Sequence, residues 1–289
     1  MESSTPDAPA PDAEAILARR MAELGVVRDM QGGLAIHRAG AGPALVLLHG
    51  GTGSWTHWLR NIDALSRHFT VLAVDQPGFG RSAAPPDDVD FDGYVGMIRA
   101  ALDAAIGKDA PVTLVCFSFG GTIGLGLAAG LGARLRKLSL LAPGGFGKPT
   151  GRDLGNRRLR DDMTAAEKRA VYRHNLRAMM LAHDSAIDDE TLSLHIRNIH
   201  LTRFRSIKLS HLAVIEDLLP RIACPVQMLW GALDPMPWPS LDHRIGVCRA
   251  VRPDIEVEII ADAGHWAQFE RAEDYNRLVL DFLTRAPDA

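Results

Sequence analysis

The sequence has few cysteines and almost no net charge, and each shortage excludes a class of protein. Its 289 residues contain three cysteines, Cys116, Cys224 and Cys248, and no pair has the CxxC spacing. Three widely separated thiols predict neither a disulfide framework nor a thiolate zinc site. The formal net charge of −3 lacks the basic excess of a general nucleic-acid binder, so we expect no nucleic-acid partner.

The sequence also lacks segments that would direct it into or across a membrane. Residues 1–7 contain no basic stretch followed by an apolar run, so we expect no secretory signal and a cytoplasmic location. The uncharged stretch 110–133 is long enough for a membrane span, but it contains six glycines and changes character at Ser118. We interpret it as a buried strand followed by a buried helix, and we expect no membrane partner.

Metal-binding motifs are missing as well. The sequence has no HExxH, and His195 and His200 are five residues apart, which would place them on different faces of a helix. We therefore expect neither a metal site nor a cofactor.

What the sequence does contain is an alternation of short apolar runs and helical stretches. Hydrophobic residues make up 47% of the chain, enough for a substantial core. Continuous apolar runs suit strands that are covered on both faces, so the alternation predicts an α/β fold with a doubly wound, mostly parallel sheet. The predicted strands cover 33–38 (at an edge), 44–48, 69–74, 112–117, 137–141, 226–230 and 255–260. The predicted helices cover about 12–24, 58–68, 91–106, 119–131 and 240–250, with a last helix whose apolar stripe includes Tyr275, Leu278, Val279, Phe282 and Leu283.

This alternation is interrupted once. Residues 144–219 have a largely helical pattern with no convincing strand. We therefore predict an N-terminal tail and short helix (1–24, the first eleven residues disordered), a core in two parts (25–143 and 220–289), and a helical cap inserted between them (144–219).

A candidate nucleophile lies at a predicted strand-to-helix turn. The segment Cys116–Gly121 is similar to the G-x-S-x-G pattern, with Ser118 at the serine and Cys116 at the first glycine. Such a turn projects the serine Oγ from the carboxyl edge of the sheet. An ordinary serine in a glycine-rich packing turn is the alternative.

Two further residues follow predicted strands. Asp234 comes just after the strand 226–230, and His265 follows the strand 255–260. Each could be structural alone, as a helix cap or a turn histidine. The carboxyl ends of parallel strands meet at one edge, however, and the chain order Ser, Asp, His is the one this architecture uses. We predict Ser118 as nucleophile, His265 as base and Asp234 as the group that orients the imidazole.

An oxyanion site needs two backbone N–H groups. The residue after the nucleophile, Phe119, would supply one, and the loop His49–Thr52 would supply the other, with Gly51 the best candidate. His49 itself is predicted to brace that loop.

This set of residues resembles the α/β-hydrolase family over roughly residues 33–285. The segment Asp75–Ser82 looks like that family's second loop motif, and the stretch 144–219 looks like its cap. The serine at the turn separates the chain from the dehalogenase and epoxide hydrolase branches, which use aspartate there.

A closer resemblance is to the meta-cleavage-product hydrolases, which cleave C–C bonds in aromatic degradation. The segments Gly264–Glu270 and Asn276–Leu283 look like their C-terminal signature, and Pro143–Gly147 is similar to their strand-to-cap junction. The resemblance implies hydrolysis of a C–C bond in a vinylogous 1,5-diketone. That family has Gly-Asn before the nucleophile, where this chain has Cys116-Phe117, so a carboxylesterase or lactonase stays open. A non-catalytic binding protein on the same fold is a third alternative.

The predicted substrate-binding residues are less tightly defined. The family's substrate-binding arginine falls at His195 here, with Arg197 two residues further on. Between Gly144 and Ser210 there are 13 Lys and Arg against 8 Asp and Glu, which favours a small anionic substrate or else marks a solvated helical face. The sequence leaves the oligomeric state open, a homo-oligomer included. The predicted substrate-binding side chains are Trp266, Phe117, Phe146, Arg197 and His195.

Overall fold

The computed structural model describes residues 12–149 and 153–286. An eight-stranded sheet runs through the molecule in the order β1-β2-β4-β3-β5-β6-β7-β8. β1 pairs antiparallel with β2, β2 pairs antiparallel with β4, and all other neighbours are parallel. The predicted doubly wound, mostly parallel α/β sheet is therefore confirmed. The strands are β1 (Val27–Gln31), β2 (Leu34–Ala39), β3 (Ala44–Leu48), β4 (Thr70–Val74), β5 (Val112–Phe117), β6 (Leu135–Leu141), β7 (Val226–Gly231) and β8 (Glu256–Ile260).

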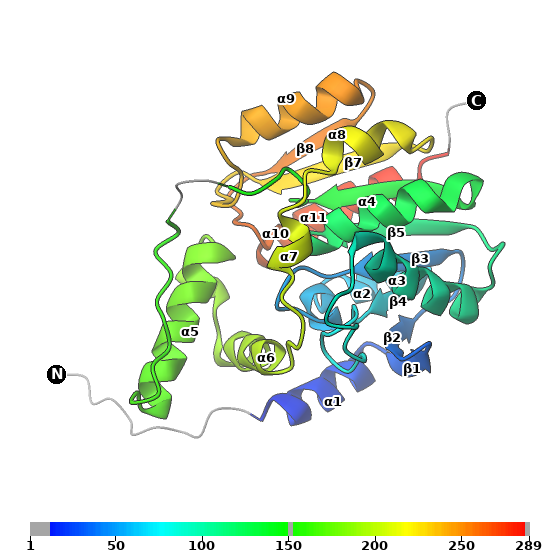
Figure 1. Ribbon diagram of the computed structural model, residues 1–289. Helices are drawn as coiled ribbons and strands as arrows, with labels where there is room; N and C mark the ends of the chain where they lie inside the picture. The colour runs from blue at the N-terminus through cyan, green and yellow to red at the C-terminus, as the bar shows by residue number, and fades with distance from the viewer. Residues whose placement is uncertain (1–11, 150–152, 287–289) are drawn as a thin grey trace.

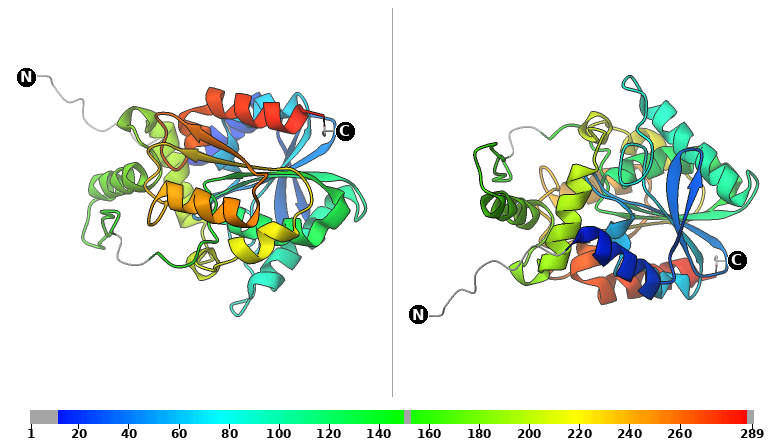
Figure 2. Two further views of the ribbon diagram at one scale, coloured as in Figure 1. Left: turned by 90° about the horizontal axis from the view of Figure 1, so that it is seen from above. Right: turned by 90° about the horizontal axis from the view of Figure 1, so that it is seen from below.

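Helices cover both faces of the sheet. Figure 2 shows α2 and α11 on one face and α3, α4, α8 and α9 on the other. The strands β5 and β7 are buried along their whole length because both faces are covered. The helices are α1 (Ala13–Glu23), α2 (Ile62–Ser66), α3 (Phe91–Ile106), α4 (Phe119–Leu131), α5 (Ala165–Met179), α6 (Asp189–His200), α7 (Ile207–Ser210), α8 (Ile215–Leu218), α9 (Leu241–Val251), α10 (Ala267–Glu270) and α11 (Ala272–Thr284).

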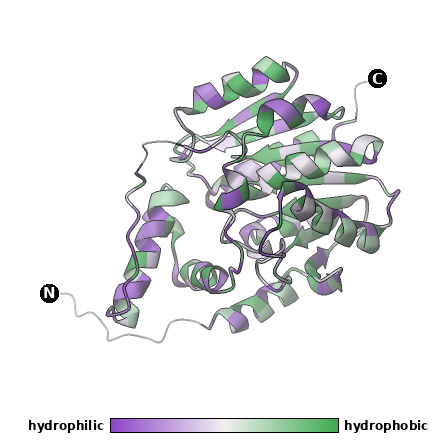
Figure 3. Ribbon diagram, viewed as in Figure 1, coloured by the Kyte–Doolittle hydropathy of each residue, from purple (hydrophilic) through white to green (hydrophobic). Residues whose placement is uncertain are grey.

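The helices α5 and α6 lie together beyond one end of the sheet (Figure 1). α5 carries more hydrophilic colour in Figure 3 than the central strands of the sheet. Between residues 153 and 219 the structure has helices and turns but no strand, as the sequence predicts. α1 packs against α6 and ties it to the body, because Glu14 pairs with both Arg81 and Arg197.

Two expectations need correction. The sequence did not predict β1, and β1 is the edge strand, so β2 lies second in the sheet. The helix expected over 58–68 is instead a short 3₁₀ turn (Trp55–Trp58) followed by α2. The break falls at Asn61, whose side chain donates to Gln268 O and Asn276 Oδ1 (both 2.8 Å).

The uncharged stretch 110–133 forms β5 and α4, as predicted. Over residues 12–149 and 153–286, none of the helices combines the length and apolar composition that a membrane crossing requires. The predicted disordered tail falls outside the described residues. α1 begins directly after Asp12, whose side chain caps it by accepting from Glu14 N (3.0 Å).

Candidate active site

Ser118 lies at the tight turn between β5 and α4. Its backbone has φ +51° and ψ −114°, which is strained for a residue other than glycine. Four backbone hydrogen bonds stabilise this strained conformation. Ser118 N donates to Leu141 O (3.0 Å), and Ser118 O accepts from Gly121 N (2.8 Å), Gly144 N (3.0 Å) and Thr122 N (3.3 Å). The turn thereby presents the side chain at the carboxyl edge of the sheet.

The small residues of α4 make this turn sterically possible. A Cβ at Gly120 would overlap the carbonyl oxygens of Leu48 and His49. Only glycine at this position lets α4 pass so close to the end of β3. A Cβ at Gly121 would lie 2.7 Å from Pro143 Cβ. The first turn of α4 therefore depends on both glycines.

Gly124 of α4 makes room for Cys116, the cysteine at the first glycine position of the motif. Cys116 is fully buried, and its Sγ occupies the space that a Cβ at Gly124 would need. Burial raises the pKa of the Cys116 thiol far above its usual range, so the group is neutral. Cys116 therefore acts as a packing residue beneath Ser118, and Gly124 supplies the room.

His265 and Asp234 extend a chain of hydrogen bonds from Ser118. His265 Nε2 lies 2.8 Å from Ser118 Oγ, and His265 Nδ1 lies 2.9 Å from Asp234 Oδ2. A carboxylate only accepts, so Nδ1 carries the proton and Nε2 accepts from the serine hydroxyl. The side chains of His265 and Asp234 are 4% and 1% exposed, which excludes competing water. This arrangement can deprotonate a serine hydroxyl and stabilise the imidazolium that results.

The two loops that carry these residues are tied to each other. Ala232 N donates to Ile260 O and Leu233 N donates to Ala263 O, both at 2.9 Å. A Cβ at Gly231 would overlap the carbonyl oxygens of Ala263 and Gly264, so the loops touch backbone to backbone. The distance between Asp234 and His265 is therefore set by main-chain contacts.

Both predicted oxyanion residues lie beside Ser118. A Cβ at Gly51 would be 3.9 Å from Phe119 Cβ, and one at Gly50 would be 3.3 Å from Ser118 Cβ. Phe119 begins α4, so its N–H belongs to the first turn and has no acceptor within the helix. Gly51 and Phe119 therefore lie close to each other beside the nucleophile, and their role in binding an oxyanion stays a prediction.

His49 braces the loop that contains Gly51. His49 Nδ1 donates to Gly50 O (2.7 Å), and His49 Nε2 accepts from Gln76 N (3.0 Å). Complete burial lowers the pKa of His49 to about 4, so the ring is neutral and this tautomer is maintained.

The predicted substrate-binding residues do not form one group. Trp266 and His195 line the same hollow, of about 460 Å³ including its open mouth. Phe117 is buried behind the site, with its ring 5.0 Å from the His265 ring. Phe146 lines a second hollow, of about 420 Å³. Arg197 lies away from both hollows, because its Nε binds Glu14 at 2.7 Å.

Sequence reasoning missed His57. Its ring lies 5.6 Å from the Phe117 ring and 4.7 Å from the Trp266 ring, and it is 1% exposed. Burial holds the pKa of His57 well below its usual range. No local signal marks the residue, because the sequence predicts a helix start there, whereas the structure has a 3₁₀ turn that faces the site.

The buried His195 predicts a pH-dependent stability. Burial lowers the pKa of His195 to about 4, below the value of about 6.5 in an unfolded chain. The folded state therefore takes up this proton less readily, and stability is lost as the pH falls below 6.5, by about 2 kcal/mol between pH 7 and pH 5. We expect His195→Gln to reduce the acid-induced loss of unfolding free energy by that amount, as urea unfolding at the two pH values would measure. An identical pH dependence in both proteins would contradict this.

The described residues offer no cluster of side chains suited to a metal ion. Across the described part of the chain, no group of three or more His, Cys, Asp or Glu side chains is arranged to hold an ion.

Comparisons with known proteins match most of the chain. Residues 45–278 match the model described as the alpha/beta hydrolase family. The 2-hydroxy-6-oxo-6-phenylhexa-2,4-dienoate hydrolase of Burkholderia cepacia is 31% identical over 270 residues, which cover 86% of this chain and 90% of that one.

Two solved structures have the same fold. A meta-cleavage product hydrolase from Pseudomonas fluorescens IP01 has a TM-score of 0.70 at 20% identity, covering 89% of this chain and 97% of that one. Naproxen esterase from Bacillus subtilis has a TM-score of 0.75 at 18% identity, covering 94% and 97%. At such identities these likenesses concern the fold alone.

Proposed function

Because the chain belongs to the alpha/beta hydrolase family, we propose that it is a serine-dependent hydrolase in which Ser118, His265 and Asp234 form the catalytic triad. The observation that carries this proposal is the pair of hydrogen bonds that join Ser118 Oγ, the two ring nitrogens of His265 and the Asp234 carboxylate. No cofactor takes part in the proposed reaction.

In the proposed mechanism His265 accepts a proton from Ser118 and later donates it to the leaving group. Ser118 Oγ attacks a carbonyl carbon while His265 Nε2 takes the hydroxyl proton, and Asp234 stabilises the imidazolium. The N–H groups of Gly51 and Phe119 bind the oxyanion that forms. His265 then returns its proton to the leaving group, and a water molecule, activated by the same imidazole, releases the acyl group from Ser118.

We propose a meta-cleavage product, a vinylogous 1,5-diketone with a carboxylate, as the substrate. The 31% identical relative, named for such a dienoate, supports this. In that reaction His265 first assists the enol-to-keto tautomerisation of the dienol. The keto form can then accept the electron pair of the C–C bond when that bond breaks. Ser118 and water then cleave the C–C bond, giving a carboxylic acid and a dienoic acid. The excess of positive charge between Gly144 and Ser210 supports an anionic substrate.

We also propose that residues 144–219 act as a cap over this site. Support comes from two contacts: Trp266 N donates to Met180 O (2.8 Å), and a Cβ at Gly51 would lie 2.7 Å from Ser206 Oγ. Such a cap would exclude water from the hydrogen-bonded triad, which strengthens its electrostatic interactions.

Ester hydrolysis is the second candidate, and Phe117 favours it. An apolar ring packs against His265 at the position before the nucleophile, where the resembled family carries an amide. The triad chemistry is the same for an ester, so the residues around Ser118 decide between the two reactions.

A substrate panel tests the proposal. We expect purified protein to bleach coloured ring-fission dienoates, with 6-phenyl and 6-alkyl substituents, faster than it releases nitrophenol from nitrophenyl acetate and butyrate, as kcat/KM from visible absorbance would measure. Rapid ester turnover with no dienoate cleavage would reject the C–C assignment and favour the second candidate. Inactivity on the whole panel, with no labelling of Ser118 by a fluorophosphonate, would favour a binding protein.

A further inference from the structure

The loop that carries His265 packs directly against the turn that follows α5. Trp266 N donates to Met180 O (2.8 Å), and a Cβ at Gly264 would lie 2.8 Å from both Ala182 N and Met180 O. The backbones of the two segments therefore touch directly on either side of His265. No side chain can be inserted between them without moving the histidine.

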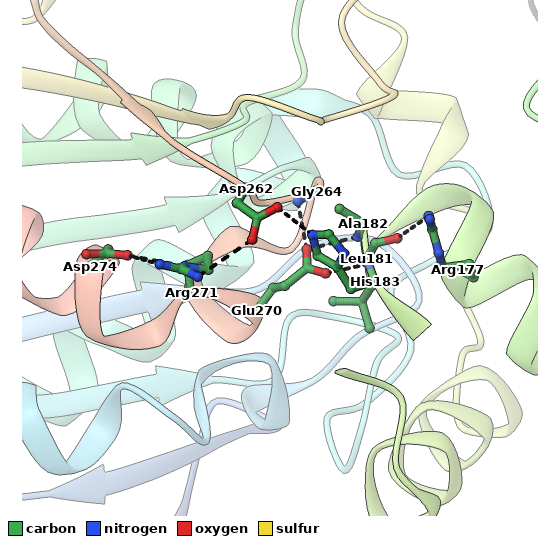
Figure 4. A network of polar contacts seen from close by, with 9 residues as sticks. All are labelled: Arg177, Leu181, Ala182, His183, Asp262, Gly264, Glu270, Arg271 and Asp274. Carbon is green, nitrogen blue, oxygen red and sulfur yellow. Dashed lines mark hydrogen bonds and ion pairs between the residues drawn. The ribbon is translucent and has the colours of Figure 1, made fainter. Parts of the chain in front are cut away.

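One carboxylate binds both segments. Glu270 Oε2 accepts from Gly264 N (2.7 Å) and from Ala182 N (2.9 Å), and Glu270 Oε1 accepts from His183 N (2.8 Å), as Figure 4 shows. Gly264 immediately precedes His265, and Ala182 and His183 belong to the turn after α5. Hydrogen bonds to an ionised acceptor are about twice as strong as neutral ones. These three bonds are therefore the strongest link between the helical segment and the histidine loop.

The surrounding side-chain contacts are weaker by comparison. His183 Nε2 lies 2.7 Å from Asp262 Oδ1, and Arg271 bridges Asp262 (3.7 Å) and Asp274 (3.0 Å). These side chains are about half exposed, so each pair contributes about 0–1 kcal/mol. They surround Glu270 without replacing its three bonds.

We propose that Glu270 is a positioning residue, which fixes His265 against Ser118 by holding the loop before the histidine and the turn after α5 with a single carboxylate. This inference rests on the proposed function. It adds that placement of the imidazole depends on docking of the helical segment. Glu270 touches no reacting atom and acts through the backbone at Gly264. A displacement of His265 by about 1 Å would lower the rate roughly 100-fold.

The test uses the rate at which a fluorophosphonate labels Ser118 in the full-length chain. Glu270→Gln keeps the size of the side chain but turns an NH₂ group toward backbone donors, so at least one of the three bonds is lost. We expect its second-order labelling rate to fall about 10- to 100-fold. Glu273→Gln, exposed one turn further on, is the matched control and should label like the wild type.

A second variant keeps the test decisive if Glu270→Gln does not fold. Glu270→Asp preserves the charge but withdraws the carboxylate by one carbon, so it cannot reach both segments, and we expect a loss of similar size in the same direction. An unchanged labelling rate in the folded variants would overturn the inference, and so would a lower unfolding temperature with unchanged labelling. A wild-type chain that is not labelled at Ser118 would overturn the proposed function, and this inference with it.

Discussion

Replacing Ser118 with alanine is expected to lower kcat by at least about 10⁴-fold on any substrate that the chain hydrolyses. In the proposed mechanism Ser118 is the only group that bonds covalently to the substrate. Its Oγ is also the atom that His265 Nε2 contacts, at 2.8 Å. Steady-state kinetics on the best substrate of the panel would measure the loss.

The fold should survive this substitution. The Ser118 side chain contributes one hydrogen bond, so its loss should change the unfolding free energy by about 1 kcal/mol. Ser66→Ala is a suitable control, because the hydroxyl of Ser66, at the end of α2, binds Asp63 O within the same short helix. Residual activity above about 1% of the wild type would mean that the hydroxyl of Ser118 is not the nucleophile.

Asp234→Asn is expected to lower kcat by about 10³- to 10⁴-fold without disturbing the geometry. Asp234 Oδ1 accepts from Met236 N (2.8 Å), and the amide oxygen of asparagine can keep this bond. Its NH₂ group then faces His265 Nδ1, where it can only donate. The histidine must carry its proton on Nε2 instead, which faces Ser118 and can no longer accept the hydroxyl proton.

Rates measured across pH, together with the unfolding temperature, would separate this tautomer effect from unfolding. Asp242→Asn provides the control, since Asp242 is an exposed residue in the first turn of α9. A loss smaller than about 10-fold would contradict the orienting role of Asp234.

The central strands were predictable because they are largely buried on both faces and are mostly apolar. β1 was not, because its residues are mostly exposed, with Val27 at 67% and Met30 at 51%, and it pairs with the sheet only through the backbone of β2. The helix expected at 58–68 was wrong for a tertiary reason. The Asn61 side chain bonds to the segment around Gln268 and Asn276, more than 200 positions away, and no local pattern reveals such a contact.

The candidate site divides in the same way. Ser118, Asp234 and His265 each follow a strand of one parallel sheet, so topology alone brings them to one edge, although their catalytic roles stay predictions. The substrate-binding residues depend on side-chain partners instead. Arg197 points to Glu14 of α1, 183 positions earlier, and helical spacing could not have predicted that pairing.

The fit of Cys116 against Gly124 constrains how this chain can diverge. A change from cysteine to glycine at position 116 leaves a void, which costs about 1 kcal/mol or somewhat more. A change from glycine to alanine at position 124 with the sulfur in place forces two buried atoms into the same space, a cost that the rigid helix cannot relax away. Of these two substitutions, the change at position 116 must therefore come first, because alanine at position 124 fits only after the sulfur of Cys116 is gone.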